Sequence, residues 1–376
     1  MVFLSLLLIF HLINSKIIVQ HYIYTLGRPA ITLDFNRENS NVVALINTFH
    51  PFSLIRRKAF TSTIDDAFLG SKTFYFDSEM PVTEYRTDVT FEGHLLPGYH
   101  VYLYNMFSWY PDQGIGLGYK FDDDRYSLVH LLYNNKLIEH KMYALFFNDA
   151  QKEGTISFGG IPNNEHLQYT FHGYCNAVDE YTSWGCNMTS IDFDNKIQRF
   201  SYYAALSNGL YGIYSKKLFD FFVNNIMQNE IKADICSIHE DETEYRKYVK
   251  CNKEIEKINK NVTFTFGNMI LKLKLIDLFE KNQNLYDSLV SNNNFHFYNK
   301  YDVLFGIKFF TFFKYLVFNY DDKRIEFYSN DISINMIQSE YFVITTTLYI
   351  IINVLCLIMI STLLIITKEI NINNIK

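Results

Sequence analysis

The run of residues 341–367, "YFVITTTLYIIINVLCLIMISTLLIIT", contains no charged side chain. A helix needs about 20 predominantly apolar residues to cross a bilayer, and this run is longer than that. The tail that follows, "KEININNIK" (368–376), ends in polar residues, whereas a lipid-anchor signal ends in its apolar stretch. We therefore expect a transmembrane helix over 341–367 and a short tail over 368–376.

The amino-terminal residues 1–15, "MVFLSLLLIFHLINS", have an apolar core and end in a small serine. This pattern is typical of a secretory signal peptide and is too short to span a bilayer of about 30 Å. Lys368 and Lys376 lie beyond the predicted helix and favour a cytosolic tail. The sequence thus predicts a single-pass type I membrane protein of the secretory pathway. Its main domain is expected in the lumen or outside the cell.

The part between the two apolar segments is about 320 residues long, which is more than one hydrophobic core usually fills. We expect two lobes, over 16–168 and 169–335. A net charge of −6 and a pI near 6.0 argue against a nucleic-acid partner.

Four of the five cysteines precede the apolar run, and an even number in an oxidising compartment favours disulfides. Proximity in sequence favours the pairs Cys175–Cys186 and Cys236–Cys251, each worth about 3 kcal/mol in the chain-entropy model. A metal site is not expected, because no CxxC motif or close histidine pair accompanies them. No cofactor is expected either.

Two sequons, "NMT" at Asn187 and "NVT" at Asn261, match the pattern of N-glycosylation acceptors. Both lie in the part of the chain that is expected to face the lumen. We predict glycosylation of both.

The body of the chain consists mainly of short apolar or alternating runs separated by Asn, Asp, Gly and Ser, the pattern of β-strands. These runs are "FYF" at Phe74, "VYLY" at Val101, "YALFF" at Tyr143, "TISFGG" at Thr155, "VTFTF" at Val262 and "RIEFYSN" at Arg324. Two stretches have helical spacing, "RYSLVHLLYNNKLI" from Arg125 and "SKKLFDFFVNNIM" from Ser215. The charged stretch "HEDETEYRKYVK" from His239 is expected to be a solvated loop. The fold class is therefore mainly β with a few short helices.

One internal duplication is visible. A strand that ends in the polar turn "NRENSN" at Asn36 is followed by "DQGIGLGY", which contains Gly116. A strand that ends in "SNG" at Ser207 is followed by "VLFG", which ends at Gly306. Glycine in such a strand allows another backbone to approach closely. The same order in both halves indicates two related lobes.

These segments resemble the pepsin-like aspartic proteases over most of the chain before the apolar run. "GTISFGGIPNN" (154–164) is similar to the end of the first lobe in that family, and "VLFGIKFFTFFKYLVFNYDDKRIEFYSN" (303–330) to the end of the second. "DQGIGLGY" with the helical stretch and "YALFFND" follows the order of the family. The resemblance implies a bilobal, β-rich fold with a central cleft for an extended peptide or protein ligand.

In that family each lobe supplies one aspartate in an Asp-Thr-Gly or Asp-Ser-Gly turn, and the two carboxyls share a proton. The resemblance places these turns at Asn36-Arg37-Glu38 and at Ser207-Asn208-Gly209, so both acids are replaced. An amide has no useful basicity, and a serine hydroxyl needs a base, but no histidine is near Ser207 along the chain. No catalytic residue is therefore expected at either position.

The resemblance also places the family's mobile hairpin over 74–93, with Tyr75 near the position of its tyrosine. The candidate cleft residues are Asn36, Arg37, Tyr75, Ser207, Asn208 and Gly209. A register two residues earlier would instead place Asp34 at the catalytic position, since residues i and i+2 of a strand share a face.

Other enzyme classes lack support, because the sequence has no HExxH helix, no G-x-S-x-G elbow, no phosphate loop and no dinucleotide fingerprint. The main hypothesis is a membrane-anchored, non-catalytic relative of the aspartic proteases that binds a peptide or protein. The alternative is an active aspartic endopeptidase with a non-standard catalytic pair.

Overall fold

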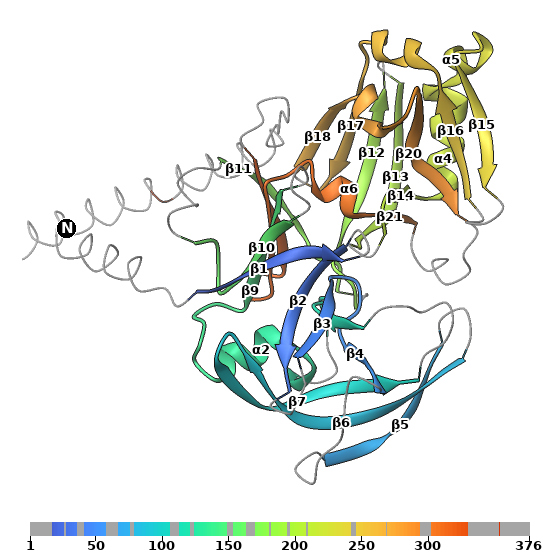
Figure 1. Cartoon of the computed structure of the whole chain (residues 1–376). Helices are drawn as coiled ribbons and strands as arrows, with labels where there is room; N and C mark the ends of the chain where they lie inside the picture. The colour runs from blue at the N-terminus through green and yellow to red at the C-terminus, as the bar shows by residue number, and fades with distance from the viewer. Residues whose placement is uncertain are drawn as a thin grey trace, which may run out of the picture.

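The structure is a computed structural model, and it is built mainly of β-strands (Figure 1). It describes residues 17–25, 28–35, 41–57, 67–75, 79–105, 113–120, 124–148, 153–162, 170–179, 182–193, 196–207, 210–241, 246–267, 269–293, 302–329 and 353. The predicted fold class, mainly β and bilobal, is confirmed.

The first sheet contains 13 strands among the described residues, in the order β11-β23-β22-β9-β10-β1-β2-β3-β8-β4-β7-β6-β5. Its strands are β1 (Ile18–Thr25), β2 (Arg28–Asp34), β3 (Asn41–Asn47), β4 (Ser53–Arg56), β5 (Ala67–Tyr75), β6 (Glu79–Phe91), β7 (His94–Tyr104), β8 (Gly114–Gly116), β9 (Met142–Asn148), β10 (Glu153–Phe158), β11 (Thr170–Asn176), β22 (Tyr315–Asn319) and β23 (Arg324–Ser329).

The second sheet contains 10 strands among the described residues, in the order β15-β16-β20-β14-β21-β13-β12-β17-β18, with β19 paired to β20. Its strands are β12 (Gly185–Phe193), β13 (Lys196–Leu206), β14 (Ile213–Tyr214), β15 (Cys236–Asp241), β16 (Arg246–Cys251), β17 (Asn261–Phe266), β18 (Met269–Lys274), β19 (Phe279–Asn282), β20 (Leu285–Asn293) and β21 (Val303–Phe305).

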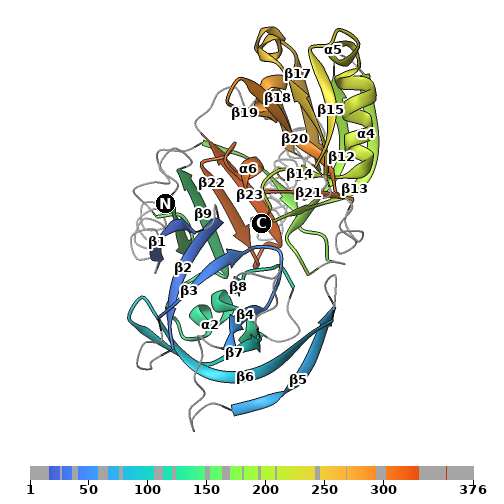
Figure 2. The ribbon, with the colours of Figure 1, turned by 45° about the vertical axis from the view of Figure 1, so that its right-hand side comes forward.

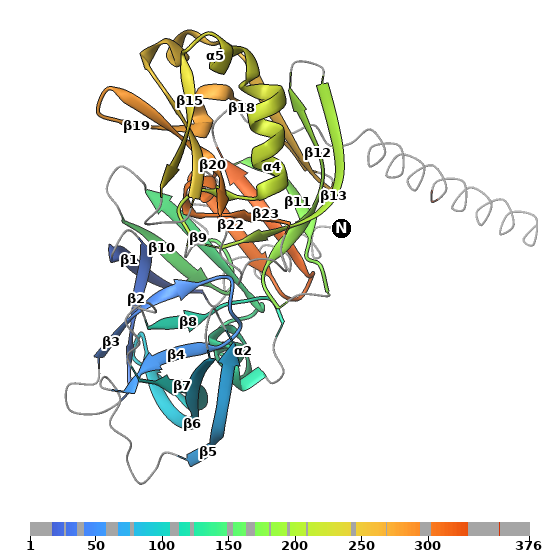
Figure 3. The same ribbon diagram turned by 90° about the vertical axis from the view of Figure 1, so that its right-hand side faces the viewer.

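The described helices are short: η2 (Asp124–Tyr126), α2 (Leu128–Asn134), α4 (Lys216–Phe221), η3 (Phe222–Ile226), α5 (Gln228–Lys232), η4 (Lys253–Lys257), η5 (Leu275–Leu278) and α6 (Ile307–Phe310). Both predicted helical stretches are confirmed, and each begins after a serine whose hydroxyl accepts a backbone N–H, Ser127 for α2 and Ser215 for α4. Figure 3 shows α4 lying against the second sheet, where it packs on β20.

The two sheets contain the same six-strand arrangement. In the first sheet the order β2-β3-β8-β4-β7-β6 has β8 between β3 and β4, parallel to β3 and antiparallel to β4. In the second, β12-β13-β21-β14-β20-β16 has β21 between β13 and β14 with the same directions. The internal duplication inferred from the sequence therefore has a structural counterpart in two related lobes.

The carboxy-terminal strands return to the first sheet. β22 pairs antiparallel with β9, and β23 lies between β22 and β11 (Figure 2). In Figure 1, β1, β9, β10 and β11 lie between the lower strands β2–β7 and the second sheet above. The chain thus connects the lobes through a shared group of strands. The lobe boundary at residue 168/169 stays a prediction.

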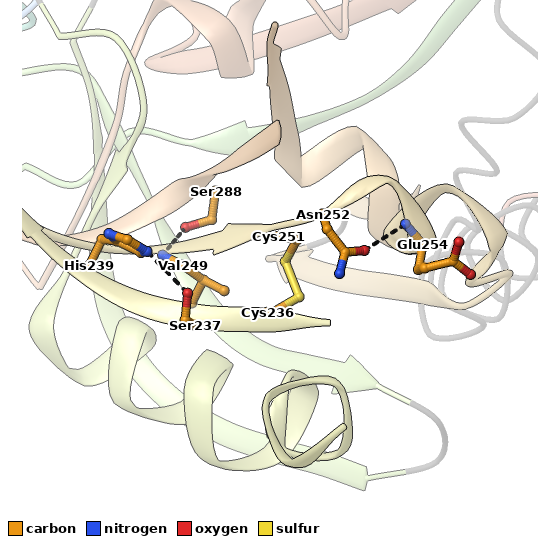
Figure 4. The surroundings of a disulfide bond; sticks show 8 residues. All are labelled: Cys236, Ser237, His239, Val249, Cys251, Asn252, Glu254 and Ser288. Atoms are coloured by element: carbon orange, nitrogen blue, oxygen red, sulfur yellow. Dashed lines mark hydrogen bonds between the residues drawn. A yellow bond between two sulfur atoms is a disulfide. The ribbon is translucent and has the colours of Figure 1, made fainter. Parts of the chain in front are cut away.

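Both predicted disulfides are confirmed. Cys175–Cys186 joins β11 of the first sheet to β12 of the second, with the Cα atoms 5.8 Å apart. Cys236–Cys251 joins the neighbouring strands β15 and β16, with a Cα separation of 4.0 Å (Figure 4).

The loop expected from His239 onward is largely wrong. Residues 236–241 and 246–251 form the β15–β16 hairpin at the edge of the second sheet, and only 242–245 lie outside the described residues. Glu240 faces solvent on β15, the edge strand among the described strands, where charge is tolerated, and Cys236–Cys251 links β15 to β16.

The predicted signal peptide (1–15), transmembrane helix (341–367) and tail (368–376) fall outside the described residues, apart from Asn353. Among the described residues no helix is long and apolar enough to cross a membrane. Asn187 and Asn261 are both exposed, on β12 and at the start of β17.

Candidate functional site

A tight turn follows β3 in the first lobe. β3 runs parallel to β8, and this register places Asn47 opposite Gly116. The Asn47 side-chain Oδ1 accepts hydrogen bonds from the backbone N–H groups of Phe49 and His50, both at 3.0 Å. Asn47 therefore holds the turn by accepting from the backbone, as asparagine and aspartate do in Asx turns.

The corresponding turn in the second lobe follows β13. β13 runs parallel to β21, which pairs Leu206 with Phe305, and Ser207 comes next, beside Gly306. The Ser207 N–H donates to the Phe305 carbonyl at 2.9 Å, and its own carbonyl accepts from the Leu210 N–H at 3.2 Å. Asn47 and Ser207 thus occupy equivalent places, each at the carboxyl end of a strand parallel to an apolar strand that ends at glycine.

The two turns meet. The Thr48 hydroxyl donates to the Leu206 carbonyl at 3.1 Å, and Thr48 is fully buried. Threonine or serine in this position of the pepsin-like turn braces the two lobes, as the resemblance implies. Asn47 precedes Thr48 and Ser207 follows Leu206. This hydrogen bond therefore places Asn47 and Ser207 on adjoining turns.

Both glycines allow two backbones to pack in direct contact. A Cβ atom on Gly116 would lie 2.4 Å from the Phe52 backbone nitrogen, and one on Gly306 would lie 2.6 Å from the Gly212 carbonyl oxygen. Phe52 and Gly212 each stand five positions after the turn residue of their lobe. This agreement between lobes is independent evidence that Asn47 and Ser207 are equivalent.

The third position of the first turn holds Phe49 instead of glycine. Its backbone does not adopt positive φ, so a large side chain is sterically allowed. The ring is 4% exposed and packs with Tyr203, Ala205 and Leu304 of the second lobe. Phe49 therefore fills space between the lobes, next to the two turns.

The segment after Gly116 is fixed by hydrogen bonds to the backbone carbonyl of Leu117. The Leu117 oxygen accepts from Trp184 Nε1 at 2.8 Å and from the Tyr143 hydroxyl at 3.0 Å, and the Tyr320 hydroxyl lies 3.1 Å from it and 2.9 Å from the Gly118 carbonyl oxygen. The three side chains come from the second lobe, from β9 and from the end of β22, and each is aromatic. These bonds fix the first-lobe turn relative to the rest of the molecule.

One histidine stands in the first turn, and the sequence analysis missed it. His50 lies far from Ser207 along the chain. It stands two residues after Thr48, and the Thr48 hydroxyl bonds to Leu206, the residue before Ser207. Burial lowers the pKa of His50 to about 4, so the ring is neutral at physiological pH. It packs against the rings of Phe49 and Phe52.

The sequence-predicted site residues are only partly described. Ser207 lies in the second turn and is 5% exposed. Tyr75 ends β5, opposite Glu79, which agrees with a place near the tip of the β5–β6 hairpin, but its side chain lies outside the described parts. The others, Asn36, Arg37, Asn208 and Gly209, also lie outside, as does Glu38, so their roles stay predictions.

The alternative carboxylate, Asp34, lies beside the end of β3 that is opposite to Asn47. It pairs with Asn41 at the start of β3, and Asn47 ends that strand. Six steps of about 3.3 Å along a strand separate the two ends by about 20 Å. Asp34 is therefore not at the position of Asn47 in the strand register.

We expect Thr48→Val to destabilise the protein by about 1–3 kcal/mol, because it leaves the buried Leu206 carbonyl without this donor. Thr32→Val, on the exposed face of β2, is the matched control and should change the free energy of unfolding by less than about 0.5 kcal/mol. Urea unfolding of both variants measures the difference. Equal effects would mean that the bond does not brace the lobes.

A polar cluster joins β5, β6 and β7 beside the first turn, where Tyr102 contacts Phe52. The Lys72 ammonium on β5 contacts Glu84 Oε2 at 3.0 Å and the Tyr102 hydroxyl at 3.1 Å. It also lies 5.4 Å and 5.9 Å from the ring centroids of Tyr102 and Tyr126. We call Glu84, Tyr102 and Tyr126 the ammonium cage.

The carboxylate of the ammonium cage is buried, with Glu84 6% exposed. The Tyr126 hydroxyl donates to Glu84 Oε1, and His100 Nδ1 lies 3.2 Å from the same oxygen. Burial by itself raises the pKa of Glu84, but the hydrogen bonds from Tyr126 and Lys72 outweigh it and hold the pKa below its ordinary value of 4.5.

A lowered folded-state pKa means that Glu84 stabilises the fold above pH 4.5 and that this contribution is lost as the pH falls through the folded-state value. We therefore expect Glu84→Gln to be less stable than the parent near neutral pH. The difference should shrink steadily between pH 5 and pH 3. Chemical unfolding at several pH values measures it, and a difference that grows on acidification would contradict the assignment.

The described fold and the paired turns define a pepsin-like protein. The profile of the family described as eukaryotic aspartyl protease matches residues 102–329, more than half of the chain. The chain therefore belongs to the eukaryotic aspartyl protease family. The matched region contains Ser207 and begins after the first turn.

Solved structures agree on the fold. The aspartic proteinase from Irpex lacteus superposes with a TM-score of 0.63 at 14% identity, covering 85% of this chain and 100% of that one. Basic 7S globulin from soybean superposes with a TM-score of 0.61 at 12% identity, covering 85% and 98%. No curated protein sequence gives a match.

Proposed function

We propose that Asn47 and Ser207 occupy the two positions where active relatives carry their catalytic aspartates. This replaces Asn36 by Asn47 as the first of the pair. The equivalent strand registers, the equivalent glycine contacts and the Thr48–Leu206 hydrogen bond support the assignment. In the sequence, Asn47-Thr48 also keeps the threonine of the Asp-Thr-Gly turn.

The same pair cannot perform the chemistry of a carboxyl dyad. That reaction needs one carboxylate to take a proton from water and one carboxylic acid to polarise the scissile carbonyl. The Asn47 amide does neither near neutral pH, and its oxygen is already engaged with two backbone N–H groups. Ser207 offers a hydroxyl, which is not acidic enough to replace the second group.

The function that follows is binding without cleavage. We propose a pepsin-like pseudo-protease, tethered to a membrane by the segment 341–367, which holds an extended peptide or protein segment between its lobes. The observation that carries this proposal is the absence of a carboxyl side chain at both described turn positions, Asn47 and Ser207. The two disulfides and the exposed sequons at Asn187 and Asn261 fit a lumenal or extracellular main domain.

Binding should lack the acid-range pH dependence that a carboxyl dyad imposes. Asn47 and Ser207 do not titrate in any accessible range, so peptide affinity is expected to vary by less than about threefold between pH 4 and pH 7. Isothermal titration against a library of extended peptides measures it. Finding no binding peptide in a diverse library would refute the binding role.

A steep affinity change with pH would show that a carboxylate controls the cleft. Asp34→Asn and Glu84→Gln then identify which one, because the first lies at the far end of β3 and the second in the ammonium cage. Dependence that disappears in Asp34→Asn would contradict the assignment of Asn47 and Ser207, whereas dependence that disappears in Glu84→Gln would come from the ammonium cage.

A further inference from the structure

The ammonium cage has the composition of a site for a cationic group. Two tyrosine rings face the Lys72 nitrogen at cation–π distance, and a buried carboxylate completes the surroundings. Tyr126 stacks on Tyr102 at 5.6 Å, and its hydroxyl is bonded to Glu84, so the three groups support one another. Aromatic faces with a carboxylate are the chemistry that recognises organic ammonium ions.

Lys72, which occupies the cage, is much more exposed than the carboxylate that it contacts. The Lys72 side chain is 52% exposed, whereas that of Glu84 is 7% exposed. Lys72 comes from β5, which lies at the end of the strand order in its sheet and, among the described strands, pairs with β6 alone. Withdrawal of Lys72 would therefore break its contacts with Glu84 and Tyr102 and leave Glu84 open to another cation.

The cage is continuous with the first turn. The Tyr102 ring contacts Phe52 at 5.6 Å, and Phe52 stacks on His50 at 5.4 Å. Phe52 is the residue whose backbone packs against Gly116. The rings of Phe52 and Tyr102 thus connect His50, in the turn of Asn47, to Glu84 in the cage.

From this arrangement we infer that the ammonium cage is a binding site for a primary alkylammonium group, the side chain of a lysine in a bound peptide, and that Lys72 occupies it in the free protein. The inference rests on the proposed peptide-binding role and adds its chemical preference. Lys72 acts as a competing internal ligand, so its removal frees the site.

The test uses a single capped residue, N-acetyl-lysine N-methylamide, and its uncharged counterpart, N-acetyl-norleucine N-methylamide. Both are titrated calorimetrically into the full-length protein, the Lys72→Ala variant and the Lys72→Ala/Glu84→Gln double variant. The lysine probe should bind Lys72→Ala at least tenfold more tightly than the parent. The norleucine probe should bind neither the parent nor Lys72→Ala. The double variant should show no binding of the lysine probe.

Equal affinity of the parent and Lys72→Ala for the lysine probe would overturn the inference, and so would norleucine binding as tightly as lysine. Circular dichroism verifies that each variant is folded, and Lys72→Gln replaces Lys72→Ala if the latter is not. The single-residue probes do not depend on extended-peptide binding. If the protein binds the lysine probe but binds no extended peptide, the proposed function is contradicted. The inference about the ammonium cage is then still supported.

Discussion

Denatured protein substrates incubated with the purified full-length chain are expected to remain uncut at pH 4 and at pH 7. The two positions equivalent by strand register hold Asn47 and Ser207, and neither side chain supplies a carboxyl group. General acid–base catalysis by positioned groups contributes about 10²–10⁴-fold for each step that uses it. Loss of both groups should therefore bring cleavage to the background rate. Gel electrophoresis against an active aspartic protease measured in parallel provides the comparison.

Cleavage that is inhibited by a statine-type transition-state mimic would contradict this expectation, since such a mimic requires an acid pair. The Asp34→Asn variant would then decide between two explanations. Loss of cleavage would show that Asp34 takes part in the reaction, although it lies beside the end of β3 that is opposite to Asn47. Retained cleavage would direct attention to carboxyl groups outside the described residues.

Local sequence patterns predicted much of the architecture. "TISF" lies in β10, "YALFF" lies in β9, and α2 and α4 begin directly after the serine caps Ser127 and Ser215. The disulfides were predictable because each links cysteines 11 or 15 residues apart. In these cases the deciding interactions are close in sequence.

The first turn that we propose for the site, at Asn47, was harder to locate because its defining contact is distant in sequence. The polar segment at Asn36 resembles the family turn locally, but β2 and β3 flank it as an antiparallel hairpin. The strand that runs parallel to β8 ends instead at Asn47, and pairing over such a distance cannot be read from a short segment. A usable signal was present, because Leu45-Ile46-Asn47-Thr48 is an apolar pair followed by an asparagine in place of aspartate and by threonine.

The substitution Gly116→Ala is expected to destabilise the protein by about 3 kcal/mol or more, the upper part of the range for overpacking in a core. A Cβ atom there would lie 2.4–2.5 Å from three backbone atoms of Phe52, and backbone atoms cannot rotate away as a side chain can. Gly114→Ala is the matched control in the same buried strand, since its nearest contact would be the Leu45 carbonyl at an ordinary 3.5 Å. It should cost less than about 1 kcal/mol. Urea unfolding of the two variants gives the difference directly.

This comparison also tests where the first half of the site lies. The contact between Gly116 and Phe52 exists only if the chain turns back immediately after Asn47 and crosses the end of β8. If Asn36 ended the strand that pairs with β8, the backbone crossing Gly116 would be a different one. The Phe52 backbone would then make no such contact. Gly116→Ala with the small effect of Gly114→Ala would therefore remove the main support for Asn47. A large effect at Gly116 alone, together with the loss of stability in Thr48→Val, would place the first-lobe turn at Asn47, because the two measurements depend on different atoms of the same turn.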